Sequence, residues 1–238
     1  MVTKSGITFD DQWHTEDNWN LKPMRIYISM PEVKEQKIDI PGGDGMIDLT
    51  EINGRPSYGL RTVELEYDLP NINNQEWYEF FSEIGTAITG RKVKMVLDDE
   101  PEHFYTVRLT VDGEKTDYSS GEITLSGTAE PFKFDLQSSG EPWKWDIFNF
   151  HTGVIRQLMD IQITGSNRTV KILGAGIDCP PVFVVTEANN LKLTHGGRTY
   201  TLKVGRNRFP AVRVGKEDVT LQFSGAGKLT IEYRGQYL

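Results

Sequence analysis

Short runs of alternating apolar and polar residues recur along this chain, and the clearest pair lies on either side of a Pro- and Gly-rich turn. The apolar positions of the two runs are Ile38, Ile40, Ile47 and Leu49. Between them, Pro41 fixes φ, while Gly42 and Gly45 permit positive φ, so the chain can reverse without strain. The pattern predicts a β-hairpin over Lys37–Thr50.

The rest of the first half is typical of strands around a single helix. Alternation over Val63–Leu69 predicts a half-buried strand. The helical apolar stripe consists of Trp77, Phe80, Phe81, Ile84 and Ile88. Asn73 or Asn74 is placed to cap this helix and Gly90 to end it. Strands resume near residues 93–97, 105–111 and 123–125, with Asp112-Gly113 as the expected turn between the last two. We expect the helix to cover one sheet of a sandwich-like domain.

The second half consists of strand-like runs separated by turn residues. Eight runs are expected near residues 161–164, 168–173, 182–186, 190–194, 199–204, 209–214, 218–223 and 228–233. Thr194–Arg198 predicts one hairpin, and Gly225-Ala226-Gly227 predicts a turn between the last two runs. Eight short strands in about 90 residues favour a jelly-roll or galectin-like β-sandwich. The fold class is therefore all-β with one helix.

Charge divides the 238-residue chain. Residues 1–145 carry 27 acidic and 14 basic residues, whereas residues 146–238 carry 7 and 12, for a total of −8. Polar residues 137–142 lie beside this change and interrupt the periodicity. We therefore predict an N-terminal β domain over residues 1–137, a linker over 138–150 and a C-terminal β-sandwich over 151–238.

The sequence offers little for catalysis. Its four histidines lack metal-ligand spacing, the single Cys179 excludes an internal disulfide, and no nucleophile elbow, phosphate loop or dinucleotide fingerprint is complete. No run approaches the ~20 apolar residues of a membrane span. The start of the chain is too acidic and polar for a signal peptide, and with the single cysteine we expect synthesis in a reducing cytoplasm. These features favour a protein that is not an enzyme and has no cofactor, no metal and no membrane partner.

Four segments together resemble the distal tail protein (Dit) family of long-tailed bacteriophages and prophages, and the likeness covers essentially the whole chain. The segments are ITFDDQWHTEDNWNL, IDIPGGDGMIDLT, GRKVKMVLDDEPEHFYTVRLT after the Trp/Phe-rich helix, and LQFSGAGKLTIEYRGQYL. Each motif is weak alone, and the case rests on their order and spacing. Gly43 is a departure, because many relatives carry a basic residue there.

The resemblance implies a structural protein of the virion tail tip whose N-terminal domain forms a homohexameric ring. This baseplate hub would join the tail tube protein to the tail-tip (Tal, tail-associated lysin) protein, and a galectin-like domain would project outward. DNA would pass through without specific binding. Candidate ring contacts are Pro41, Gly42 and Gly45. Candidate acidic residues of the lumen are Glu64, Glu66, Asp68, Asp98, Asp99 and Glu100.

Other interpretations remain for some of these residues. The hairpin is as readily a plain surface turn, and Asp98–Glu100 a solvated turn. Trp143 and Trp145 belong to an aromatic cluster that either seals a joint between domains or stacks on sugars. The alternative function is accordingly a carbohydrate-binding module for cell-wall glycans. A glycan-degrading enzyme with paired carboxylates has little support in the basic half.

Overall fold

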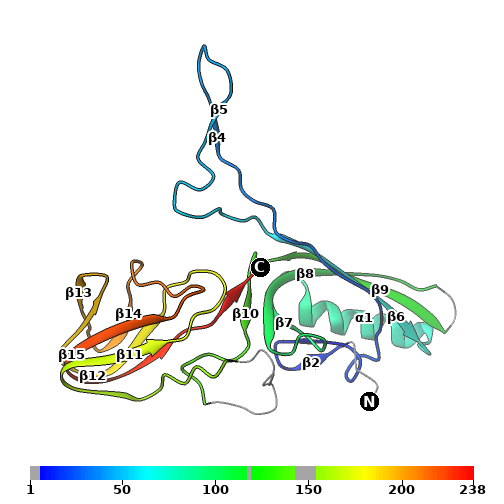
Figure 1. The fold of residues 1–238 in the computed structure, drawn as a ribbon. Coiled ribbons are helices and arrows are strands. Elements are labelled where there is room, and N and C mark those ends of the chain that lie inside the picture. The colour runs from blue at the N-terminus through cyan, green and yellow to red at the C-terminus, as the bar shows by residue number, and fades with distance from the viewer. Residues whose placement is uncertain (1–5, 117–118, 143–153) are drawn as a thin grey trace. The chain divides into compact units, whose positions relative to one another are not determined.

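The computed structural model describes residues 6–116, 119–142 and 154–238, which form two compact units (Figure 1). Unit 1 comprises Met1–Glu100 and Phe104–Lys133, and unit 2 comprises Pro101–His103 and Phe134–Leu238. Apart from one helix in unit 1, the described regular structure is β-sheet. The predicted fold class, all-β with one helix, is confirmed.

Seven strands of unit 1 form one antiparallel sheet. In chain order they are β1 (Ile7–Phe9), β2 (Trp13–His14), β3 (Lys22–Ile28), β6 (Arg61–Pro70), β7 (Lys92–Leu97), β8 (His103–Glu114) and β9 (Ser120–Ala129). Their hydrogen-bonded order is β2-β1-β7-β8-β9-β6-β3, so β3 lies at one end. The alternating burial of β6 places Val63 and Leu65 in the core and Glu64 on the opposite face.

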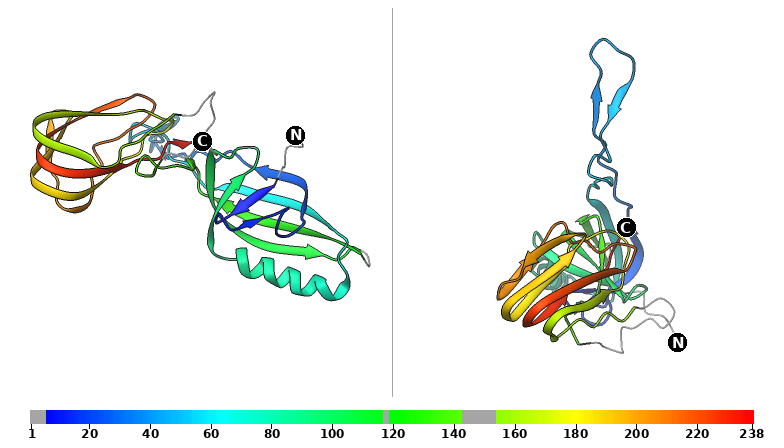
Figure 2. Two further views of the ribbon diagram at one scale, coloured as in Figure 1. Left: turned by 90° about the horizontal axis from the view of Figure 1, so that it is seen from below. Right: turned by 60° about the vertical axis from the view of Figure 1, so that its left-hand side comes forward.

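Helix α1 (Asn74–Ile88) lies along one face of this sheet (Figure 2). Its buried residues Trp77, Ile84 and Ile88 belong to the same core cluster as the inward residues of β6, β8 and β9. The Asn73 Oδ1 atom accepts the backbone N–H of Glu76 at 3.0 Å, which is the predicted N-terminal cap. Gly90, at φ +77°, follows the last turn, as expected. The predicted helix is confirmed.

Residues 29–60 leave the sheet between β3 and β6 as a long excursion, which we call the arm. It carries β4 (Lys37–Asp39) and β5 (Met46–Asp48), which pair only with each other within the described residues (Figure 1). Ile38 pairs with Ile47, and the turn between the strands contains Gly42 at φ +74° and Gly45 at φ +85°. The hairpin predicted over Lys37–Thr50 is confirmed.

Unit 2 contains long, bent strands. They are β11 (Ile161–Ile172), β12 (Val182–His195), β13 (Arg198–Thr201), β14 (Gly205–Arg208) and β15 (Val219–Glu232), in the order β11-β15-β12-β13 with β14 on β12. The short strands β10 (Lys133–Asp135) and β16 (Gln236–Tyr237) pair with each other and do not belong to this five-stranded sheet. Inward residues of both halves of the long strands, such as Phe183 and Leu193 of β12, pack into one core cluster. The jelly-roll or galectin-like type stays a prediction.

The expectation of eight short strands in this half is wrong, because three pairs of runs are continuous strands. Register shifts at Gly165/Arg168 in β11 and at Asn189/Lys192 in β12 bend them instead of ending them. Gly225-Ala226-Gly227 likewise lies inside β15 and is not a turn. Residues 209–214 form no strand, whereas the hairpin at Thr194–Arg198 is confirmed.

The predicted turn at Asp112-Gly113 is also wrong, because both residues lie within β8. A Cβ atom on Gly113 would lie 2.8 Å from the Phe81 ring of α1. Glycine is needed here because the helix packs closely on the strand, not because the chain reverses.

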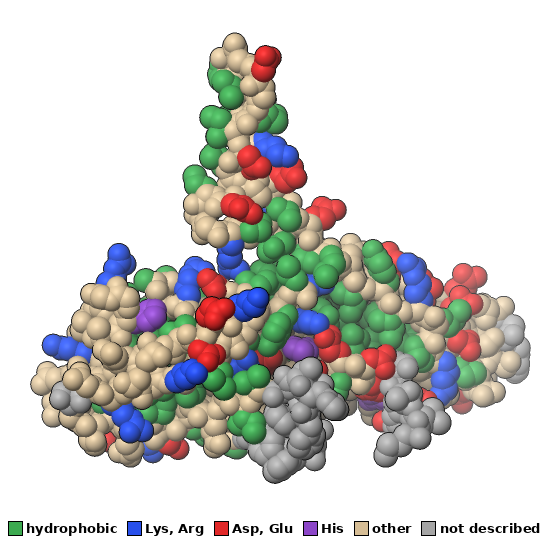
Figure 3. Space-filling view, viewed as in Figure 1, with side chains coloured by type: hydrophobic (Ala, Val, Ile, Leu, Met, Phe, Trp, Pro, Cys, Tyr) green, Lys and Arg blue, Asp and Glu red, His purple; other side chains and the backbone are tan. Residues whose placement is uncertain are grey.

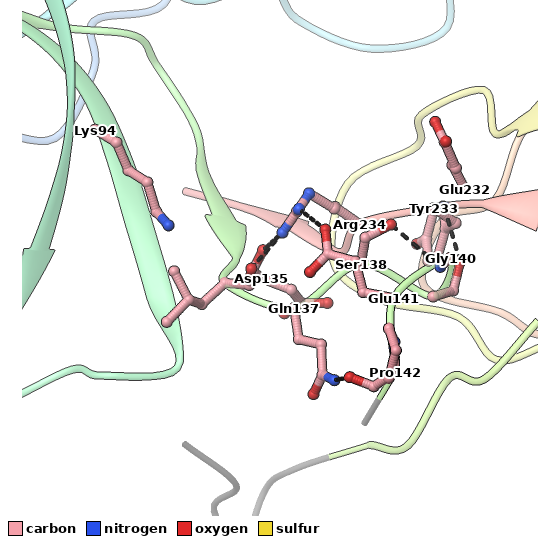
Figure 4. A network of polar contacts seen from close by, with 12 residues as sticks. Lys94, Asp135, Gln137, Ser138, Gly140, Glu141, Pro142, Glu232, Tyr233 and Arg234 are labelled. Carbon is pink, nitrogen blue, oxygen red and sulfur yellow. Dashed lines mark hydrogen bonds and ion pairs between the residues drawn. The ribbon is translucent and has the colours of Figure 1, made fainter. Parts of the chain in front are cut away.

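Residues 138–142, the described part of the predicted linker, belong to unit 2 and bond to its last strands. The Ser139 hydroxyl donates to the Ile231 carbonyl at 2.6 Å and accepts the Tyr233 N–H at 2.8 Å. Arg234 donates to the Glu141 carboxylate and, at 2.9 Å, to the Asp135 carbonyl (Figure 4). The division into 1–137, 138–150 and 151–238 stays a prediction, since residues 143–153 lie outside the described residues.

Candidate functional site

Exposed apolar side chains gather on β3 and the arm. Eleven of the sixteen exposed large hydrophobic residues of the described chain lie between residues 24 and 60. These are Met24, Ile26, Tyr27, Met30, Val33, Ile38, Ile40, Met46, Ile47, Ile52 and Leu60. Figure 3 shows hydrophobic side chains, in green, along the arm. A patch of this kind marks an interaction surface more often than a solvated one.

The hairpin at the end of the arm is amphipathic. Ile38 and Ile47 lie opposite each other on one face and are 53% and 50% exposed. The cross-strand pair Lys37 and Asp48 lies on the other face. All six residues of β4 and β5 are exposed, and an isolated two-stranded hairpin is at best marginally stable in water. Among the residues that the structure describes, nothing covers this apolar face.

The tip of the hairpin holds the predicted interface residues Pro41, Gly42 and Gly45. All three are exposed, and a Cβ atom added to Gly42 or Gly45 would meet nothing within 4 Å. The glycines are therefore required by their positive φ and not by a close approach. Their role in ring contacts stays a prediction.

The root of the arm is fastened to unit 1 by a buried arginine. Arg61, the first residue of β6, is 3% exposed, and it donates from Nε to the Pro131 carbonyl and from Nη1 to the Ser29 carbonyl, both at 2.9 Å. Ser29 is the first residue of the outgoing chain. One side chain thus holds both ends of the arm to the loop after β9.

Aromatic contacts complete the root. The ring of Tyr58 packs edge-on against that of Phe132 at 5.8 Å, and the Arg55 guanidinium lies 5.9 Å from the Phe132 ring centre. The Lys34 N–H donates to the Ser57 carbonyl at 2.8 Å and pairs the outgoing and returning chains. The arm is thereby fixed at its base while its tip is uncovered.

Strand β3 offers a second candidate contact. It ends the hydrogen-bonded order of the sheet, and no strand of the described residues pairs with its outer edge. Met24 and Ile26 are 59% and 37% exposed on this strand. An edge that is both apolar and unpaired is a template for pairing with another chain.

Three of the predicted lumen residues come together on β6. Glu64, Glu66 and Asp68 occupy the face of the sheet that points away from α1. Arg25 on β3 lies 3.3 Å from the Glu64 carboxylate and 2.8 Å from that of Glu66. These contacts raise the pKa of Arg25, the Glu66 hydrogen bond being the largest cause.

The other three lumen candidates lie in the turn after β7 and are placed differently. Asp98 Oδ2 accepts the Gly6 N–H and lies 3.0 Å from His14 Nε2. Glu100 binds Lys133 and accepts the Tyr105 hydroxyl, whereas Asp99 is exposed. Asp98 and Glu100 therefore hold local structure, and the lumen assignment of all six residues stays a prediction.

The candidate sugar-contact residues and possible metal sites were also sought in the structure. Trp143 and Trp145 lie outside the described residues. Within the described ranges, no group of three or more His, Cys, Asp or Glu side chains is placed to hold a metal ion. In the same part of the chain, no helix is long and apolar enough to cross a membrane.

Sequence reasoning missed the arginines at the root of the arm. A single Arg before a strand gives no signal that its side chain is buried, since arginine is usually exposed. The Nη2 atom of Arg61 and the Nη1 atom of Arg55 are buried without an acceptor among the described residues.

With this geometry in view, the chain has the fold of a phage Dit protein. The solved structure of the Dit protein of phage SPP1 covers 99% of this chain, and this chain covers 100% of that one, with a TM-score of 0.63 and 14% sequence identity. That protein is described as a paradigm of the hub adsorption apparatus in phages that infect Gram-positive bacteria. The expected resemblance is confirmed at the level of the fold. No protein-family model and no curated protein matches the chain.

Proposed function

We propose that this chain is a structural protein of a phage tail that builds a hub from copies of itself. The observation that carries the proposal is the arm, whose hairpin exposes an apolar face that nothing in the described chain covers. The shared fold with a hub protein of a phage adsorption apparatus supports the same role. The location that follows is the tip of the virion tail.

Self-assembly accounts for the apolar face energetically. Covering a half-exposed isoleucine contributes on the order of 1 kcal/mol. Ile38, Ile40 and Ile47 are 53%, 40% and 50% exposed, so one hairpin offers several kcal/mol to an interface. If the partner is a second copy of the chain, every hairpin has one matching surface available, because each copy carries both.

A ring follows if the arm of one copy binds a different surface of the next. Contacts between unlike surfaces generate closed rings when the rotation closes. The number six, the tail tube protein on one side and the Tal protein on the other are carried by the family resemblance alone. Acidic Glu64, Glu66 and Asp68 would suit a lumen through which DNA passes, because like charges repel the phosphate backbone.

The proposal is tested with the double variant Ile38→Asp/Ile47→Asp, which places two charges on the apolar face. We expect light scattering coupled to size-exclusion chromatography to show an oligomer for the wild type and a monomer for the variant. Val204→Asp is the matched control, because Val204 is 66% exposed on unit 2 and lies outside the arm. Circular dichroism verifies that both variants fold.

Assembly of the double variant at the wild-type concentration would contradict this role of the hairpin. The carbohydrate-binding alternative depends on Trp143 and Trp145 and stays a prediction, to be tested by binding of the full chain to a glycan array.

A further inference from the structure

Two arginines at the root of the arm have hydrogen-bond donors that are buried without an acceptor. They are Arg61 Nη2 and Arg55 Nη1. Both guanidinium groups lie against the same dipeptide, since Arg61 donates to the Pro131 carbonyl and Arg55 lies over the Phe132 ring. An unmade hydrogen bond of a buried donor costs about 1–3 kcal/mol. Two such donors in one place are therefore unusual for a surface that binds no partner.

Arg61 also makes no ion pair within the described chain, although its guanidinium lies 5.7 Å from the centre of the Tyr105 ring. Its other donors go to neutral acceptors, namely the carbonyls of Pro131 and Ser29 and the sulfur of Met30 at 3.6 Å. Burial is the main cause that lowers the pKa of Arg61 below its ordinary value. Tyr105 and then the Glu100 carboxylate act in the opposite direction on this pKa, and Glu100 itself contacts Lys133 and Tyr105.

We propose that Arg55 and Arg61 form a docking site for a carboxylate, and that the carboxylate comes from the hairpin of a second copy of this chain. The site rests on the self-assembly proposed above. Guanidinium groups bind carboxylates through charge-assisted hydrogen bonds, which are the strong ones in proteins. Met30, which contacts Arg61 and is 71% exposed, is the side chain that gives way to the incoming group.

The hairpin carries suitable carboxylates. Asp39, which pairs with Met46 on the face opposite Ile38, and Asp44, in the turn, are both exposed, and the structure gives neither a cationic partner among the described residues. Glu35, by contrast, pairs with Lys37, and Asp48 accepts the Thr50 N–H at 2.9 Å. Asp39 and Asp44 are therefore the acids that remain available for a neighbour.

In such an interface the apolar face of the hairpin and its carboxylate would contribute differently to binding. The apolar face supplies most of the binding free energy, and the carboxylate fixes where along the neighbour the hairpin lies. Electrostatic complementarity acts chiefly on register and partner choice. A buried charge pair is also screened less by salt than an exposed one.

The test compares three variants of the full chain with the wild type by sedimentation velocity. Arg55→Glu replaces one of the two positive charges of the site by a negative one, Asp39→Lys/Asp44→Lys reverses the charge of the hairpin, and the third variant combines all three changes. We expect each reversal alone to weaken assembly at least about tenfold, the order expected for a buried charge pair. The combined variant should recover most of the lost assembly, because the carboxylate introduced at position 55 then faces an introduced lysine of the hairpin. Arg208→Glu, an exposed change on unit 2, is the matched control and should assemble like the wild type.

Each outcome decides between the inference and the function on which it rests. If the wild type assembles and Arg55→Glu assembles equally well, water fills the site and the docking inference is overturned, while the proposed hub stands. If both single reversals weaken assembly but their combination does not restore it, the contact is not direct and the inference also fails. If the wild type remains monomeric, the proposed function and the docking site fall together.

Discussion

At the scale of single residues, Arg61 is the position on which the arm depends. Its side chain is buried between the outgoing chain at Ser29 and the loop at Pro131, and it binds both carbonyls. An interior guanidinium is costly unless its donors are used. Its Nε and Nη1 atoms hold the arm to unit 1, and its Nη2 atom has no acceptor among the described residues.

Replacing Arg61 by Gln should destabilise unit 1 by about 3 kcal/mol, because two partly buried carbonyls lose a charged donor. The matched control is Arg25→Gln, whose ion pairs with Glu64 and Glu66 are solvent-exposed. We expect the control to cost at most about 1 kcal/mol, as surface pairs do. Urea denaturation followed by tryptophan fluorescence measures both, and equal losses would contradict a special role for Arg61.

Tyr105 gives unit 1 a stability term that depends on pH. Burial raises the pKa of Tyr105 from 10.0 to about 12. A pKa that is higher in the folded state contributes stability that is fully present below pH 10 and is lost as the pH rises to about 12.

The Tyr105→Phe variant should therefore lose less stability than the wild type between pH 9 and about pH 11.5. The difference between the two proteins isolates this hydroxyl from the lysines, which titrate in the same range. If the unfolding free energies of the wild type and Tyr105→Phe changed with pH in parallel, Tyr105 would have the same pKa in the folded and unfolded states, and the prediction would be wrong.

At the scale of elements, the periodicity of the sequence predicted the helix and the strands whose formation depends on nearby residues. The hairpin over Lys37–Thr50, helix α1 and strand β6 are confirmed because alternation, a 3.6-residue stripe and an Asn cap each act within a few residues. The failures at Asp112-Gly113 and Gly225-Ala226-Gly227 have one cause. In both places glycine admits a close neighbour from a distant segment, and sequence alone does not distinguish this use from a turn.

The same limit applies to the candidate site. Alternation located the apolar face of the hairpin, but nothing in the sequence indicated that the exposed residues continue along β3 and the arm. The unsatisfied arginines depend on Pro131 and Phe132, about 70 residues away from Arg61 in the chain. Long-range packing of this kind is set by the fold.

Gly225 tests the interpretation of the bent strands. It has φ +91°, and a Cβ atom there would lie 2.3 Å from the Asn190 carbonyl oxygen. Gly225→Ala should cost unit 2 about 3 kcal/mol, from strain and overlap together. Gly165, its cross-strand partner, has φ +84° with open space around it, so Gly165→Ala should cost only about 1 kcal/mol.

Urea denaturation of the two glycine variants measures this difference. A loss as small for Gly225→Ala as for Gly165→Ala would mean that the two strands do not approach closely at the bend.

At the scale of the whole molecule, the two units differ in what they leave uncovered. Unit 1 carries the arm and the unpaired edge of β3, both rich in exposed apolar residues, whereas unit 2 has few such residues among those described. Assembly should therefore be a property of unit 1. We therefore expect copies of this chain to associate through the arm.

Negative-stain electron microscopy of the purified full-length protein, at the highest concentration at which it is soluble, tests this claim most directly. The account predicts closed rings with an open centre, and it predicts that the Ile38→Asp/Ile47→Asp variant forms none. Single particles of one subunit in the wild type, or rings that persist in the variant, would contradict it.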